Sequence, residues 1–96
     1  MAEFIRVYAP NSDEMVKLKL ACYELERLSR HGTRYYVEET YFDFGQNWTY
    51  SAIIADKGNG DTWQAVCPRD YERILLSTDI ADTCRQIVSS KYFYDP

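Results

Sequence analysis

The sequence predicts a single α+β domain over residues 1–96: a mostly antiparallel four-stranded sheet, in the element order β-α-β-β-β-α-α, with helices packed on one face. Three observations predict this class. An early segment has apolar residues at helical spacing, the middle has runs of strand-forming residues separated by glycine turns, and the last third returns to helical spacing. Chains divide into several domains only above about 250 residues, so 96 residues form one.

The first predicted elements are a strand and a long helix. Glu3–Ala9 alternates and is β-branched and aromatic, which is typical of a strand. Asn11 or Ser12 can cap the N-terminus of the following helix. Its buried face is predicted from apolar residues at spacings of three and four: Leu18, Ala21, Cys22, Leu25 and Leu28. Gly32 is predicted to end this helix as its C′ residue.

Two hairpins are predicted in the middle of the chain. The runs Arg34–Phe44 and Asn47–Asp56 are separated by Gly45-Gln46, a two-residue hairpin signal. The glycine-containing loop 57–60 then leads to a third run, Asp61–Cys67.

The last third is predicted to form two helices and a tail. Pro68 suits the first position of one helix, and Ser77 or Thr78 starts the other. The inward residues are predicted to be Tyr71, Ile74, Leu75, Ala81, Cys84, Ile87 and Val88. The aromatic tail Lys91–Pro96 either packs back on the domain, where it would cover the open sheet face, or reaches a neighbouring molecule.

The turn at Gly45-Gln46 predicts a register in which Val37 faces Ile54, and therefore which side chains share a face. With a turn at Gly58-Asn59, the core side is predicted to carry Tyr35, Val37, Glu39, Tyr41, Trp48, Tyr50, Ala52, Ile54, Trp63, Ala65 and Cys67. The other side is mostly polar, yet it holds Tyr36, Phe42, Phe44 and Ile53. Rings gathered on one exposed face indicate an interface, so these four residues are the predicted protein contacts, unless the tail covers them or Phe44 only caps the hairpin tip.

Glu39 stands out because it is the carboxylate on the predicted core side. It either hydrogen-bonds a tyrosine hydroxyl or sits in water near the sheet edge, or it lines a ligand pocket with Trp48, Tyr50 and Trp63. A buried carboxylate has a raised pKa and often marks a functional site, although structural polar networks shift pKa values as well.

The cysteines do not indicate catalysis. Cys22 and Cys84 fall on buried helical stripes and are predicted to be small core residues. Cys67 precedes the proline-started helix, where a helix N-terminus can activate a thiol. A cysteine nucleophile also needs a base, and the single histidine, His31, is far from it in sequence.

Motifs for metals and cofactors are equally scarce. One histidine and scattered cysteines do not make a zinc site. Asp56 and Asp61 flank the loop 57–60 but lack the twelve-residue calcium pattern, so they are predicted to form turns. The nucleotide fingerprints and the G-x-S-x-G motif are missing from the sequence. We therefore expect no cofactor, no metal and no enzymatic activity.

The charge of the chain predicts its partners. A formal net charge of −4, without an apolar stretch long enough for a signal peptide or membrane span, predicts a cytoplasmic protein that binds neither nucleic acid nor membrane. Helix, three antiparallel strands, helix is also the order of double-stranded RNA-binding domains, but the segment CPRDYER balances two arginines with two acids and lacks the basic cluster they need.

Protein binding is therefore the leading functional hypothesis. We expect a protein partner with a basic surface, or a homodimer that covers the aromatic sheet face. Small acidic domains of this kind are typical of accessory or inhibitor proteins of mobile elements. The alternative is a small-molecule binding domain with an aromatic cleft between sheet and helices.

Overall fold

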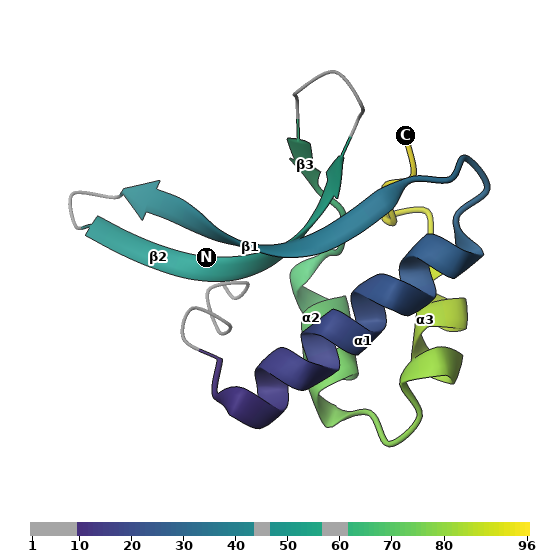
Figure 1. The fold of residues 1–96 in the computed structure, drawn as a ribbon, viewed down its shortest axis with the longest axis horizontal. Helices are drawn as coiled ribbons and strands as arrows, with labels where there is room; N and C mark the ends of the chain where they lie inside the picture. Colours follow the sequence, from purple (N-terminus) through teal and green to yellow (C-terminus); the bar gives the residue numbers. More distant parts are fainter. Residues whose placement is uncertain (1–9, 44–46, 57–61) are drawn as a thin grey trace.

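The computed structural model describes residues 10–43, 47–56 and 62–96, but not the side chains of residues 39–43, 47–50, 62 and 68. Within these ranges the chain forms three helices and a three-stranded antiparallel sheet, with the first helix packed against the sheet (Figure 1). The α+β prediction is confirmed. The strand predicted over Glu3–Ala9 lies outside the described residues.

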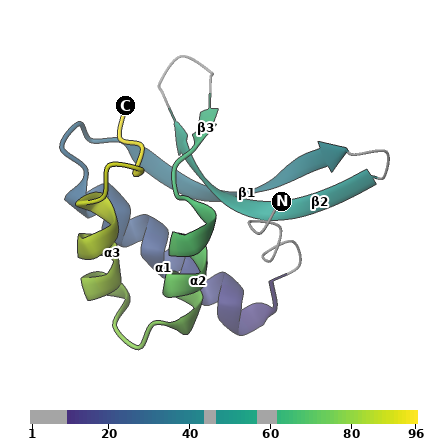
Figure 2. The ribbon, with the colours of Figure 1, turned by 180° about the vertical axis from the view of Figure 1, so that it is seen from behind.

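The elements are, in order, α1 Ser12–Leu28, β1 Arg34–Asp43, β2 Asn47–Asp56, β3 Thr62–Gln64, α2 Pro68–Leu76 and α3 Ile80–Val88. The strand order is β1-β2-β3, so β2 is the central strand of the described sheet. All three helices lie on the same side of the sheet (Figures 1 and 2). Helix α1 runs under β1, and α2 and α3 both contact α1.

The start of α1 follows the prediction closely. Asn11 is the N-cap: its Oδ1 accepts from the Glu14 amide at 2.8 Å, and the Glu14 carboxylate accepts from the Asn11 amide at 3.0 Å. This reciprocal pair satisfies two amides that a helix end leaves unbonded. The helix ends earlier than predicted, with Ser29 as its C-cap, so the prediction of Gly32 as the C′ residue is wrong. Gly32 lies in the connection to β1 with φ of +67°, a conformation that favours glycine.

The C-terminal helices pack against α1. Lys17 of α1 donates its Nζ to the carbonyl oxygens of Leu75 at 2.8 Å and Ser77 at 3.2 Å, which satisfies acceptors at the end of α2. The N-cap of α3 is Asp79, whose side chain accepts from the Asp82 amide, so α3 begins slightly after the predicted start.

The pairing of β1 with β2 differs by one residue from the predicted register. Val37 faces Ile53, not Ile54, because three residues, 44–46, separate the paired strand ends where the prediction allowed two. Successive side chains of a strand point to opposite faces, so a shift of one residue moves every side chain of β2 to the other face.

The pairing of β2 with β3 is also shifted by one residue. Ala55 faces Trp63, and Tyr35 of β1 faces Ala55. The two shifts compensate, so the residues of β1 and β3 that were predicted to share a face do share it. The face assignment is wrong for β2 alone.

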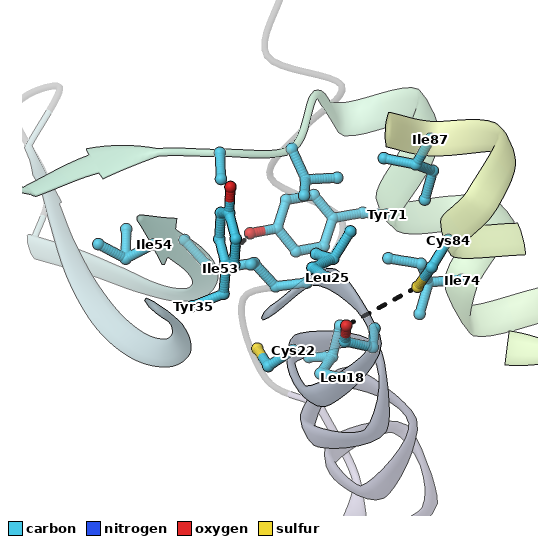
Figure 3. Close-up of a cluster of buried hydrophobic side chains, with 14 of the residues drawn as sticks. Leu18, Cys22, Leu25, Tyr35, Ile53, Ile54, Tyr71, Ile74, Cys84 and Ile87 are labelled. Atoms are coloured by element: carbon cyan, nitrogen blue, oxygen red, sulfur yellow. Dashed lines mark hydrogen bonds between the residues drawn. The ribbon is translucent and has the colours of Figure 1, made fainter. Parts of the chain in front are cut away.

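Ile53 shows the consequence of this register. Its side chain is fully buried, so its prediction as an exposed contact residue is wrong. The Tyr71 hydroxyl of α2 accepts a hydrogen bond from the Ile53 amide, and the Ile53 carbonyl accepts from the Ala65 amide at 2.9 Å (Figure 3). Both faces of β2 are buried over 51–55.

The core around Ile53 joins the sheet to all three helices (Figure 3). Cys84 of α3 donates its thiol to the Ala21 carbonyl of α1 at 3.7 Å. Cys22 and Cys84 are buried, as predicted, and burial raises the pKa of Cys22 to about 12 and that of Cys84 to about 11. Other large buried side chains in the cluster include Leu18, Leu25, Tyr35, Ile54, Tyr71, Ile74 and Ile87.

The burial of Ile53 can be tested by truncating its side chain. Ile53→Ala should lower the free energy of unfolding by about 2–5 kcal/mol, because it opens a cavity among buried neighbours. Leu76→Ala, at an exposed position of α2, is the matched control and should change it by no more than about 0.5 kcal/mol. Urea denaturation measures both. Equal, small losses for the two variants would contradict the burial of Ile53.

Candidate functional site

The surface predicted from the hairpin is largely not confirmed. Among its four residues, Tyr36 is the one whose exposed side chain the structure describes, at 37% exposure. Ile53 is buried. The side chain of Phe42, and Phe44 altogether, lie outside the described residues.

The predicted ligand pocket depended on the incorrect register. In the observed ladder Glu39 pairs with Ser51, and Tyr50 pairs with Thr40. Positions 39 and 50 therefore belong to opposite faces of the sheet. Trp63, predicted for the core, is 60% exposed, with its ring 6.0 Å from that of Tyr94. The side chains of Glu39, Trp48 and Tyr50 lie outside the described part of the chain.

The tail after α3 packs back on the domain, but on the core side of the sheet. The Tyr94 amide donates to the Ala65 carbonyl at 3.1 Å, and the Tyr35 hydroxyl donates to the Tyr94 carbonyl at 3.0 Å. The Phe93 ring lies 5.5 Å from the Tyr35 ring. Tyr35 points into the core, so the tail covers that face of β1 and not the face that carries Tyr36.

Asp95 anchors this tail to the connection between α1 and β1. Its Oδ1 accepts from the hydroxyls of Ser29 and Thr33, both at 2.7 Å, and its Oδ2 accepts from the Arg30 amide at 2.9 Å. Burial by itself raises the pKa of Asp95, but these hydrogen bonds and the nearby His31 bring it below its ordinary value. The charged carboxylate therefore holds the end of the tail in place.

Acid should release this anchor. Because the folded pKa of Asp95 is lowered, its contribution to stability is present above the unfolded pKa of about 4 and is lost as pH falls through the folded value. Asp95→Asn should therefore lower the free energy of unfolding at neutral pH by about 1–3 kcal/mol and flatten its dependence on acid. Asp82→Asn, at an exposed site with the same charge change, is the control for urea unfolding across pH. An unchanged acid slope in Asp95→Asn would contradict the anchor.

Cys67 occupies the predicted position but not an activated one. It is the N-cap of α2, and its thiol donates to Asp70 Oδ2 at 3.2 Å instead of capping the helix. Burial raises the pKa of Cys67, and the Asp70 carboxylate adds to the rise. His31 instead places its Nδ1 3.1 Å from the Asp95 carbonyl. The thiol thus stays protonated, with a carboxylate as its partner.

The same helix end borders a hollow of about 430 Å³, lined by Cys67, Arg69, Asp70, Arg73, Ser90 and Tyr92. Asp70 is buried and pairs with Arg73 Nη1 at 3.2 Å, while Arg73 Nη2 also donates to Gln86. Two guanidinium groups stand against one carboxylate here, beside the positive end of a helix dipole. The hollow is chemically suited to a small anion.

Sequence reasoning missed the outer face of α1. Val16, Leu20 and Tyr23 are 55%, 48% and 71% exposed. Spacings of four and three place them along one stripe, here called the outer stripe, on the side of α1 opposite the buried residues. Figure 1 shows α2 and α3 behind α1 and the sheet above it, and in Figure 2, seen from behind, α2 and α3 lie in front of α1. Among the described elements none covers the side of α1 that faces the viewer in Figure 1. The spacing of these three apolar residues is visible in the sequence and is the signal that could have found them.

Tyr36 extends the outer stripe onto the sheet. Tyr23 and Tyr36 both line a hollow of about 260 Å³ between α1 and β1, together with Lys19, Glu26 and Val37. Partial burial raises the pKa of Tyr36, and the carboxylates of Glu38 and Asp56 raise it further. We refer to Val16, Leu20, Tyr23 and Tyr36 together as the outer surface.

Comparison with protein-family models, with curated proteins and with solved structures finds no match to this chain. In the ranges that the structure describes, no three His, Cys, Asp or Glu residues are placed to hold a metal ion. None of the helices described has the length and apolar character needed to cross a membrane.

Proposed function

We propose that this protein is a small acidic protein-interaction module without catalytic machinery, and that it binds through the outer surface. The observation that carries the proposal is the outer stripe, which presents three large apolar side chains where an amphipathic helix usually exposes polar ones. Adjoining exposed apolar side chains mark interaction sites, and tyrosine is enriched in interfaces. The proposed contact surface therefore lies mainly on α1 and not on the hairpin face, and Tyr36 belongs to both.

The proposal also includes the partner, the cellular location and the class of protein expected from the sequence. A net charge of −4 favours a basic protein surface or a second copy over nucleic acid or membrane, in a cytoplasmic setting. Size and charge suit an accessory or inhibitor protein of a mobile element. A fourth strand over Glu3–Ala9 would complete the predicted sheet.

Photo-crosslinking in cells tests the interaction surface. A photoreactive amino acid at position 20 should form covalent adducts, because Leu20 lies in the middle of the outer stripe. The same amino acid at position 76, where Leu76 is 78% exposed on α2, is the matched control and should form few. Mass spectrometry identifies the adducts. Absence of any adduct at position 20, with itself or with another protein, would contradict the proposed function.

Anion binding is a second candidate, favoured by the hollow beside Cys67. It replaces the predicted aromatic cleft with a site where Arg69 and Arg73 meet the start of α2. Helix N-termini and arginine side chains are the usual ligands of phosphate and carboxylate groups.

A thermal-shift titration with inorganic phosphate tests this candidate. Saturable stabilisation of the wild type is expected because a ligand that binds only the folded state raises its melting temperature. Arg69→Ala should abolish that rise, whereas Arg85→Ala, an exposed arginine on α3, should leave it unchanged. A rise that survives in Arg69→Ala, or that chloride reproduces at equal ionic strength, would rule the site out.

A further inference from the structure

We infer that the outer stripe binds a second copy of this chain, with two α1 helices packed antiparallel about a twofold axis at Leu20. The inference rests on the proposed function, because it names the partner of the same surface. It follows from the positions of apolar and charged residues along α1.

The apolar residues of α1 are arranged so that the stripe is complementary to itself. α1 spans Ser12–Leu28, so Leu20 is its midpoint. In an antiparallel pair each residue before the midpoint faces one at an equal distance after it. Leu20 therefore meets Leu20 of the second copy. Val16, four residues before the midpoint, comes level with position 24 and so packs beside Tyr23, which is three residues after it. Each copy contributes the same contact, so the three exposed apolar side chains are all covered.

The charged residues at the ends of the stripe fix its direction. Asp13 and Arg27 each lie seven residues from Leu20, which is close to two helical turns, so both share the outer side of α1 with it. An antiparallel pair places Asp13 opposite Arg27 of the second copy, twice by symmetry. A parallel pair would instead bring Asp13 against Asp13 and Arg27 against Arg27, and like charges in register are unfavourable.

The neighbouring charges are compatible with this contact. Arg27 is exposed and pairs with Glu24 at 2.7 Å, an exposed pair of the kind that contributes little to stability and can be exchanged. Lys19 lies on the flank toward β1, beside Tyr36 in the hollow between α1 and β1. Lys19 would lie at the rim of the contact, where salt and water screen the repulsion between the Lys19 side chains of the two copies.

The expected dimer is weak and reversible. One helix pair buries less surface than a standard stable interface, and association also costs translational and rotational freedom. A dissociation constant in the micromolar range is therefore expected, with monomer and dimer both populated in ordinary solution experiments.

Sedimentation equilibrium of charge-reversed variants tests the inference. Wild type should change from monomer to dimer with rising concentration. Asp13→Arg alone, and Arg27→Asp alone, should each remain monomeric at concentrations where wild type is dimeric, because each places like charges together at both ends. An equimolar mixture of the two variants should dimerise again, because every contact in the mixed pair then joins opposite charges.

The mixture separates binding from folding. Either reversal also opposes the helix dipole, and a purely structural defect would persist after mixing. A wild type that stays monomeric up to millimolar concentration, single variants that dimerise like wild type, or a mixture that stays monomeric would each overturn the inference. If wild type is monomeric while crosslinking at position 20 captures another protein, self-association fails and the proposed function stands; if position 20 captures nothing, both fail.

Discussion

The burial of Ile53 in the central strand is the constraint on which the rest of the structure depends. Its side chain lies in the core, its amide donates to Tyr71 of α2, and its carbonyl accepts from Ala65 after β3. These contacts join the central strand to α2 and to the segment after β3. One side of α1 packs into the same core, and Leu20 and its neighbours on the opposite side are left in solvent.

The core and the outer surface are therefore largely independent of each other. The buried side of α1 contacts the sheet and the two C-terminal helices, and the tail anchored by Asp95 closes the core at the start of β1. Val16 and Tyr23 contribute little to this packing, because both are mostly exposed. A partner can bind them without rearranging the fold, which is what a rigid interaction module requires.

The sequence predicted the features that depend on local signals. The cap at Asn11, the buried stripe of α1 and the proline start of α2 all follow from residues close in sequence. The register of β2 could not be obtained in this way, because Gly45-Gln46 indicated a two-residue turn where three residues intervene, and one residue reverses a face. The Asp95 anchor joins residues more than 60 positions apart, which no local pattern reveals. The outer stripe could be seen as a spacing, but which stripe faces the core is decided only by packing.

The central claim, that α1 pairs with its own copy in the antiparallel sense, is tested most directly by isotope-filtered nuclear Overhauser spectroscopy. A mixture of ¹³C-labelled and unlabelled wild-type protein reports only contacts between copies. The account predicts cross-peaks that join the Val16 methyl groups of one copy to the Tyr23 ring of the other. Intermolecular cross-peaks from a different surface, from Val16 to Val16 as in a parallel pair, or none at millimolar concentration would contradict it.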